Sequence, residues 1–196
     1  MEPAVIVIGG SAGSLDALLA IVTALPDALA IPIVVALHLS PTQPSVLPEL
    51  LSRMCRRTVR EVEDKQALQR AAIHVAPPNY HVLVERGRTL SLSVDAPVHF
   101  SRPSIDLLFE SAADALGPAV VGVLLSGANE DGARGLRRIR DAGGTAVIQD
   151  PATAPHPEMP AAALRWIGDQ AHVIPLPALA HRLPTIIGAM ASHQDT

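Results

Sequence analysis

Aromatic side chains make up only 2% of the 196 residues, and the chain contains a single cysteine, Cys55. The shortage of aromatics argues against a platform that stacks the bases of single-stranded nucleic acid. A lone cysteine excludes an internal disulfide and fits a reducing compartment. Lysine and arginine together number 15 against 19 acidic residues, a formal net charge of −4. This balance argues against a nucleic-acid binder that relies on positive charge.

Long apolar runs are also missing. The longest stretches, such as residues 119–125, are far shorter than the ~20 residues that a membrane-spanning helix needs. The acidic start Met1-Glu2-Pro3 leads straight into a strand-like block and does not resemble a signal peptide. We therefore expect a cytoplasmic protein without membrane insertion. Apolar residues still make up 48% of the chain, enough to bury a large core in one domain, which we expect to span residues 1–196.

Short apolar blocks alternate with helical patterns along most of the chain. A block that is apolar at every position is typical of a strand buried on both faces, as in a parallel sheet. We expect such strands at residues 4–8, 31–37 and 119–125, further strands at 145–148 and 171–174, and helices at residues 15–25, 45–57, 104–116, 133–142, 160–167 and 178–191. This order predicts an α/β fold of three layers, with a doubly wound, mostly parallel sheet.

The middle of the chain follows another pattern. Residues 72–75, 81–84 and 89–94 have the composition of short strands separated by turn residues, which predicts an antiparallel hairpin inserted into the parallel pattern. Ser104 follows Pro103 and is placed to cap the next helix, with Asp106 favourable in its first turn.

Polar residues follow three of the expected strands where each one ends. Ser11 lies in the turn after the first strand, His38 follows the second, and Asp131 lies in the segment SGANEDG after the strand at 119–125. In an open α/β sheet, ligands bind beyond the carboxyl ends of the strands. A serine is a poor nucleophile until a base takes its proton, and a carboxylate holds that base in the required tautomer. The three residues are therefore candidates for an activated serine nucleophile.

Each of these residues also has a structural alternative. Ser11 is suited to capping the helix that begins near residue 15, Asp131 to capping the helix at 133–142, and His38 to closing its strand through a bond to a carbonyl. The glycine-rich turn before the first helix would favour an anion, but it does not match G-x-G-x-x-G, and no P-loop is present. The histidines show no metal-binding spacing, so we expect neither metal nor cofactor. Cys55 lies in a helix without a neighbouring base and is expected to be packed.

Several segments resemble, in order and spacing, the catalytic domain of the CheB-type chemotaxis protein-glutamate methylesterases. They are VIVIGGSAGS (5–14), ALHLSP (36–41), HVAPPNYHVLV (74–84), SRPSIDLLFESAA (101–113), VGVLLSGANEDGARGL (121–136), and IQDPAT with PEMPAAAL (148–164). The order serine, histidine, aspartate also matches that family and differs from the order in α/β-hydrolases. The resemblance covers nearly the whole chain.

This resemblance implies a hydrolase that removes methyl groups from glutamate methyl esters on the cytoplasmic helices of methyl-accepting chemoreceptors, releasing methanol. Members of the family also deamidate certain receptor glutamines. The resemblance assigns Ser11 as the nucleophile, His38 as general base and acid, and Asp131 as the group that orients His38. It places oxyanion or substrate-binding groups at Ala12, Ala128 and Arg102, although a surface ion pair is an equally simple role for Arg102.

The sequence departs from the family pattern in the loops around this site. The family commonly has threonine where this chain has Ala12. Its loop T-G-M-G-x-D-G corresponds to SGANEDG here, so that Ala128 keeps a backbone donor while Asn129 replaces a glycine. That replacement would alter the loop if the position required a positive φ.

A further departure is that family members usually carry an N-terminal receiver domain. The first strand begins at residue 4 here, so we expect no receiver and consider a separate receiver or a methyltransferase acting in trans as partners. Two other functions stay open at this point: a non-catalytic binding module of the same fold, and an esterase whose ester is not on a chemoreceptor.

Overall fold

A computed structural model describes residues 4–26, 28–40 and 44–192, with side chains described up to residue 189; Met1, Glu2, Pro3 and Pro41, used above, lie outside the described residues. The strands are β1 (Val5–Gly10), β2 (Ile33–Leu37), β3 (Thr58–Glu61), β4 (Gln66–Ala67), β5 (Ala72–Val75), β6 (His81–Glu85), β7 (Thr89–Ser93), β8 (Val120–Leu124), β9 (Thr145–Gln149) and β10 (His172–Ile174). The helices are α1 (Leu15–Ala24), α2 (Leu47–Met54), α3 (Ile105–Leu116), α4 (Ala133–Asp141), α5 (Glu158–Ile167) and α6 (Leu176–Ser192).

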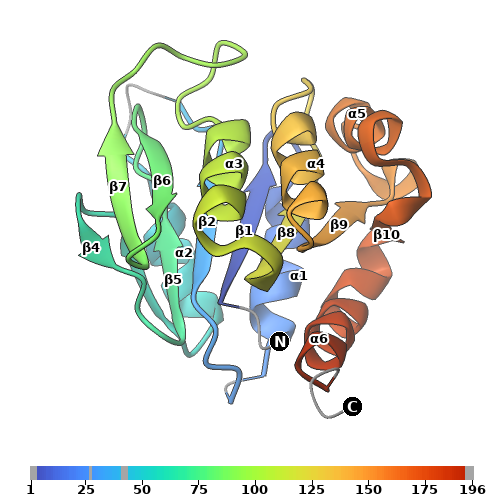
Figure 1. The fold of residues 1–196 in the computed structure, drawn as a ribbon, viewed down its shortest axis with the longest axis horizontal. Helices are drawn as coiled ribbons and strands as arrows, with labels where there is room; N and C mark the ends of the chain where they lie inside the picture. The colour runs from blue at the N-terminus through green and yellow to red at the C-terminus, as the bar shows by residue number, and fades with distance from the viewer. Residues whose placement is uncertain (1–3, 27, 41–43, 193–196) are drawn as a thin grey trace.

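The main sheet has seven strands in the order β10-β9-β8-β1-β2-β5-β3, and every neighbouring pair is parallel. From β1 the chain runs outward through β2 to one edge, then returns to β8 beside β1 and runs to the other edge (Figure 1). The strand order therefore reverses between β1 and β8, the position at which doubly wound sheets bind ligands. The predicted α/β, doubly wound fold is confirmed.

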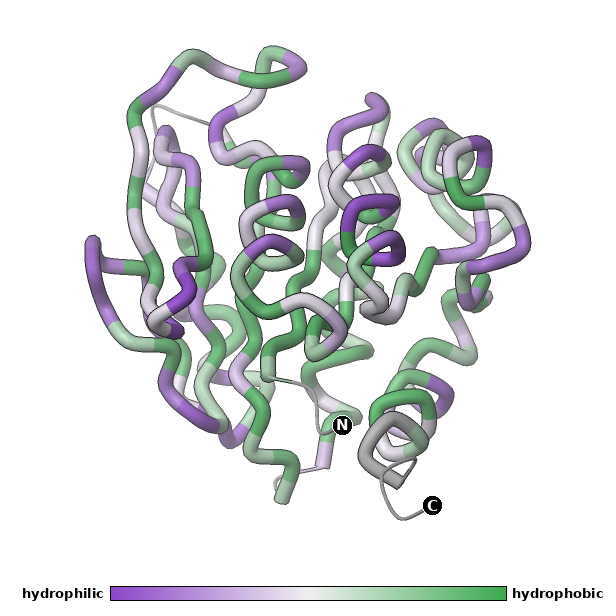
Figure 2. The backbone as a smooth tube through the Cα atoms, viewed as in Figure 1, coloured by the Kyte–Doolittle hydropathy of each residue, from purple (hydrophilic) through white to green (hydrophobic). Residues whose placement is uncertain are grey.

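Alternate residues of β1 enter different cores because successive side chains of a strand point to opposite faces. Val5 and Val7 pack with buried residues of α3, α4 and α5. Ile6 and Ile8 pack with α1, α2 and α6 on the other face. Figure 1 shows these two helical layers around the sheet, and Figure 2 shows hydrophobic strands in the middle with hydrophilic residues on the outer sides of α3 and α4. Burying strands on both faces explains why they are apolar at nearly every position.

The segment between β2 and α3 differs from the prediction in the strand at residues 72–75. β6 and β7 form the predicted antiparallel pair, joined by β4 in a small sheet. Residues 72–75, however, form β5, which pairs in parallel with β2 and β3, so the prediction that groups them with the hairpin is wrong. All four residues of β5 are buried, as an inner strand of a two-sided sheet requires. β3 has no equivalent in the sequence prediction, because this edge strand is mostly exposed and polar.

The helix predicted at residues 45–57 is shorter than expected, and its apolar face is only partly used. Leu47 and Leu51 are buried, whereas Val46 and Met54 are 73% and 46% exposed. Among the described residues, no helix combines the length and the apolar character needed to cross a membrane.

Candidate active site

The strand ladder brings the first two predicted site residues together. Gly10, the last residue of β1, pairs with Leu37, the last residue of β2. The ladder continues one step further, because the His38 amide donates to the Gly10 carbonyl over 3.2 Å. On the other side of β1, the Ser11 amide donates to the Ser126 carbonyl over 2.9 Å. Ser11 and His38 therefore lie at one edge of the sheet, beside the loop that follows β8.

His38 and Asp131 are 93 residues apart in the chain and form a direct hydrogen bond. Nε2 of His38 lies 2.8 Å from Oδ2 of Asp131. The Asp131 side chain is fully buried, and 11% of the His38 side chain is exposed. A buried carboxylate that bonds one ring nitrogen fixes the orientation and tautomer of the imidazole and leaves the other nitrogen to accept a proton.

The Asp131 carboxylate is held at the N-terminus of α3. It accepts hydrogen bonds from the backbone amides of Ile105 and Asp106, at 2.7 and 3.0 Å, and from the Ser104 hydroxyl at 3.0 Å. Burial alone would raise the pKa of Asp131, but the hydrogen bonds from His38 and from the two amides outweigh it and lower the pKa. The carboxylate is therefore ionised and oriented at neutral pH.

The alternative roles of Asp131 and Ser11 as caps are not the ones observed. The N-cap residue of α4 is Gly132, and Asp131 instead binds the first amides of α3. The N-cap residue of α1 is Ser14, whose hydroxyl donates to the Ser11 carbonyl over 2.7 Å. Among the described residues, the Ser11 hydroxyl has no hydrogen-bond partner, neither at a helix end nor at His38, which it adjoins in the pocket. Ser104 does cap α3 as predicted, by accepting from the Leu107 amide.

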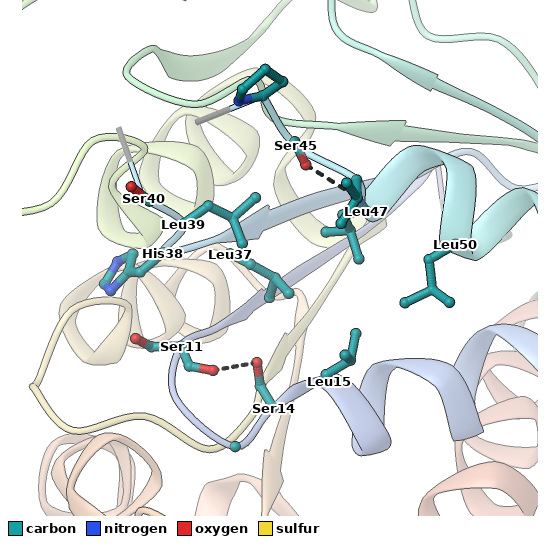
Figure 3. A pocket seen from close by; sticks show the side chains of 13 residues that line it. Ser11, Ser14, Leu15, Leu37, His38, Leu39, Ser40, Ser45, Leu47 and Leu50 are labelled. Carbon is teal, nitrogen blue, oxygen red and sulfur yellow. Dashed lines mark hydrogen bonds between the residues drawn. The ribbon is translucent and has the colours of Figure 1, made fainter. Parts of the chain in front are cut away.

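A pocket of about 300 Å³ opens beside Ser11 and His38. Figure 3 shows these two side chains next to each other at one end of the pocket, with Leu15, Leu47 and Leu50 at the other. The described lining consists of aliphatic, serine, glycine and proline residues with His38, and it contains no permanently charged side chain. Such a pocket suits an uncharged acyl group better than a carboxylate.

Backbone amides at the two predicted oxyanion positions are unpaired. Among the described residues, the amides of Ala12 and Ala128 donate to no protein acceptor, and both residues are exposed. The replacement at Asn129 does not need a left-handed backbone, since its φ is not positive. Its side-chain oxygen instead accepts from the Asp131 amide over 3.2 Å, so Asn129 supports the loop that carries Asp131.

Arg102 lies near His38 but is occupied by its own loop. It lines a second, smaller pocket of about 140 Å³ together with His38 and Ser101. Its guanidinium donates to the Asn79 side chain and to the carbonyl oxygens of Val94 and Asp95. These bonds fasten the loop between β7 and α3, and among the described residues they include no ion pair.

Sequence reasoning missed three supporting side chains. Ser101 places its hydroxyl 3.3 Å from Nδ1 of His38. The buried Ser126 hydroxyl donates to the Ala12 carbonyl and accepts from the His156 amide. Asp106 binds the amides of Gly132 and Gly135 through Oδ1, beyond its predicted role in the first turn of α3. Ser101 lies in the SRPS segment, but no sequence feature indicates that it faces His38.

Three described residues bring possible metal-binding atoms together. His99, Asp106 and Asp131 each place one such atom within 4.8 Å of the others. Both carboxylates already accept backbone amides, and a cation there would compete with His38 for Asp131. Burial raises the pKa of Asp106, the Gly135 amide opposes that shift, and the neighbouring Asp131 charge adds to it. The two carboxylates of this cluster are therefore explained by their hydrogen bonds to the first amides of α3 and α4, which hold Asp131 in place.

The chain is similar to known proteins over most of its length. A family model described as CheB methylesterase matches residues 6–183. A Leptospira interrogans protein, provisionally named protein-glutamate methylesterase/protein-glutamine glutaminase, is 43% identical over 81% of this chain and 82% of its own. A Geobacter metallireducens protein named protein-glutamate methylesterase/protein-glutamine glutaminase 3 is 37% identical over 94% of this chain and 52% of its own. The crystal structure of the Thermotoga maritima CheB methylesterase catalytic domain superposes with a TM-score of 0.86 at 26% identity, covering 97% of this chain and 100% of that one.

Proposed function

Because the chain belongs to the CheB methylesterase family, we propose that it hydrolyses glutamate methyl esters on the cytoplasmic helices of methyl-accepting chemoreceptors. Ser11 is the nucleophile, His38 the general base and acid, and Asp131 the residue that orients His38. The observation that carries this assignment is the 2.8 Å bond between His38 and the buried Asp131, beside a pocket that Ser11 lines.

Acylation begins when Oγ of Ser11 attacks the ester carbonyl carbon and His38 takes the hydroxyl proton. Since Asp131 occupies Nε2, the proton goes to Nδ1. The carbonyl π electrons move to the oxygen, and we assign the amides of Ala12 and Ala128, which have no protein acceptor among the described residues, to bind the negative charge. Removing one such donor from a serine hydrolase typically costs ~10²–10³ in rate. The C–O bond to the methoxy group then breaks, and His38 returns the proton so that methanol leaves.

Deacylation repeats these steps with water. His38 removes a proton from water, the oxygen attacks the acyl-Ser11 carbonyl, and the proton returns to Ser11 as the carboxylate is released. A glutamine amide enters the same sequence with ammonia in place of methanol, an activity that the names of the relatives include. The absence of charged groups among the described pocket-lining residues favours binding of an uncharged ester or amide over retention of the carboxylate product.

The test is methanol release from membranes that carry methylated receptors. The native chain should release methanol, and Ser11→Ala should release essentially none while its circular dichroism stays native. Ser52→Ala is a matched control, because among the described residues this exposed hydroxyl on α2 bonds only the Pro48 carbonyl and does not line the pocket. Release that persists in Ser11→Ala would refute Ser11 as the nucleophile. No release from folded native protein would refute the receptor ester as the substrate.

A further inference from the structure

We propose that Ser101 is a positioning residue for the general base, and that its hydroxyl exchanges hydrogen bonds with His38 during the proton transfer. The role of Ser101 in catalysis rests on the proposed function, whereas the contact between Ser101 and His38 is observed independently of it. Oγ of Ser101 lies 3.3 Å from Nδ1 of His38 and 3.4 Å from the carbonyl oxygen of His99.

The two ring nitrogens of His38 have different partners. Nε2 faces the ionised Asp131 and carries the proton of the neutral ring. Nδ1 is therefore the nitrogen whose lone pair can accept a proton, and in the described structure the Ser101 hydroxyl is the hydrogen-bond partner of that nitrogen. A hydroxyl both donates and accepts, so Ser101 can serve either protonation state of the ring.

The backbone around Ser101 is strained in a way that directs its side chain. The Val98 amide donates to the Ser101 carbonyl over 3.1 Å, and the Ser101 amide donates to the Val98 carbonyl over 2.8 Å. The two residues between them, His99 and Phe100, have φ values of 48° and 61°. Tight turns with two positive φ values normally contain asparagine or glycine. Strain of this kind persists where surrounding structure enforces it and is concentrated at functional sites.

The loop beside this turn is anchored at several points. The Arg102 guanidinium holds the carbonyl oxygens of Val94 and Asp95, and its own carbonyl accepts from the Asn79 amide. The buried His81 bonds the Ala96 carbonyl through Nε2 and accepts from the Ser104 amide through Nδ1. The turn that carries Ser101 is thus fixed on both sides, which limits how far its hydroxyl can move from His38.

The Ser101 hydroxyl proton has two acceptors within reach, Nδ1 of His38 and the carbonyl oxygen of His99, and it can move from one to the other. When His38 is neutral and no substrate is bound, the Ser101 hydroxyl donates to Nδ1. Its proton turns to the His99 carbonyl when the Ser11 hydroxyl approaches, which frees the Nδ1 lone pair to take the Ser11 proton. Once Nδ1 carries that proton, it donates to Oγ of Ser101. A hydrogen bond to a charged ring is stronger than one to a neutral ring. Ser101 therefore stabilises protonated His38 more than neutral His38, which assists the step in which Ser11 loses its proton.

Other charged or titratable groups surround His38 and stay unchanged when Ser101 is replaced. Asp131 bonds Nε2, and Asp106 lies behind it on α3. His99 is two residues from Ser101 and lies 3.6 Å from Asp106, and Arg102 shares the smaller pocket with His38. A shift in the titration of His38 after substitution of Ser101 can therefore be assigned to the lost hydroxyl.

The direct test is an NMR titration of the His38 ring in the native protein, Ser101→Ala, Ser101→Thr and Ser93→Ala. The Ser93 hydroxyl bonds Asp95 near the same loop, so its removal controls for loosening of that loop. Ser101→Ala should move the His38 midpoint to lower pH by roughly 0.5–1 unit, the size that one hydrogen bond to a charged group supports. Ser101→Thr should keep the His38 midpoint at its native value, because threonine also has a hydroxyl, and Ser93→Ala should leave the midpoint unchanged. An unchanged midpoint in Ser101→Ala would refute the proposal.

Kinetics separate this proposal from the esterase assignment. In an active enzyme, Ser101→Ala should lower kcat by about three- to tenfold, with little change in KM, and move the acid limb of the pH–rate profile in the same direction as the NMR midpoint. The NMR result does not require turnover, so an inactive native protein would refute the proposed function while leaving the Ser101 contact measurable. A rise in KM with kcat unchanged would refute a role through His38.

Discussion

Asp131 binds amides at the start of α3, the helix that contains Asp106, and Asp106 binds amides at the start of α4, the helix that follows Asp131. Asp131, which directly precedes the turn into α4, accepts from Ile105 and Asp106 at the start of α3. Asp106, on α3, accepts from Gly132 and Gly135 at the start of α4. Each carboxylate therefore lies at the positive end of a helix dipole. This reciprocal arrangement fixes the orienting carboxylate of the site to two helices at once.

The Asp106 side chain should accordingly be important for folding. Asp106→Ala leaves two buried amides without an acceptor, and we expect the free energy of unfolding to fall by about 2–4 kcal/mol. Urea denaturation followed by circular dichroism measures this. Glu110 lies on α3 like Asp106 and forms an ion pair with Arg134 of α4. Glu110→Ala should lower the free energy of unfolding by less than ~1 kcal/mol. Equal losses in the two variants would contradict the capping role.

Replacing the orienting carboxylate should reduce turnover more than binding. In Asp131→Asn the amide cannot stabilise a protonated His38, and it no longer selects the tautomer with a free Nδ1. We expect kcat to fall by about 10³–10⁴-fold with a small change in KM, as for the corresponding change in other serine hydrolases. Steady-state kinetics on a soluble ester would show this, and a loss below tenfold would exclude Asp131 from this role.

The lowered pKa of Asp131 predicts how stability depends on pH. In the unfolded chain an aspartate titrates near ~3.9, whereas the folded pKa lies below that value. The stabilisation is therefore present above ~3.9 and is lost as the pH falls through the folded pKa. The difference in unfolding free energy between the native protein and Asp131→Asn should be larger at pH 7 than at pH 3. Urea titrations at both values test this, and a constant difference would contradict it.

Gly132 should tolerate a side chain less well than another glycine with a similar φ. Gly132 and Gly143 both have positive φ, at 92° and 85°. A Cβ at Gly132 would lie 2.6 Å from side-chain atoms of Ile105 and Leu124, whereas the atom nearest to a Cβ at Gly143 is a side-chain carbon of Pro118 at 3.3 Å. Gly132→Ala should therefore be more destabilising than Gly143→Ala by about 1–3 kcal/mol. Thermal unfolding of the two variants decides the matter, and equal melting temperatures would count against the steric argument.

The central strands were predictable because burial on both faces makes them apolar at successive positions. β1, β2 and β8 carry this pattern, and their carboxyl ends bring Ser11, His38 and the loop of Asp131 to one edge. The polar edge strand β3 lacks such a pattern. Assigning β5 to the hairpin failed because four residues of sequence do not reveal which sheet they join.

The supporting residues of the site were harder to predict for a different reason. Asp131 has the sequence position of a cap for α4, yet it binds the amides of α3, because the packing of two helices and not local sequence decides its partners. The approach of Ser101 to His38 depends on two positive φ values at His99 and Phe100. Positive φ is uncommon at any residue other than glycine, and phenylalanine does not favour it, so the sequence does not indicate this turn.

The measurement that tests the central claim most directly is site mapping of a fluorophosphonate adduct by mass spectrometry. A reagent of this class labels a serine whose proton a neighbouring base removes. We predict one adduct, on Ser11, that forms far more slowly in His38→Ala and is absent from Ser11→Ala. An adduct on Ser101, or none on the folded native protein, would contradict the assignment of Ser11, His38 and Asp131 as the catalytic group.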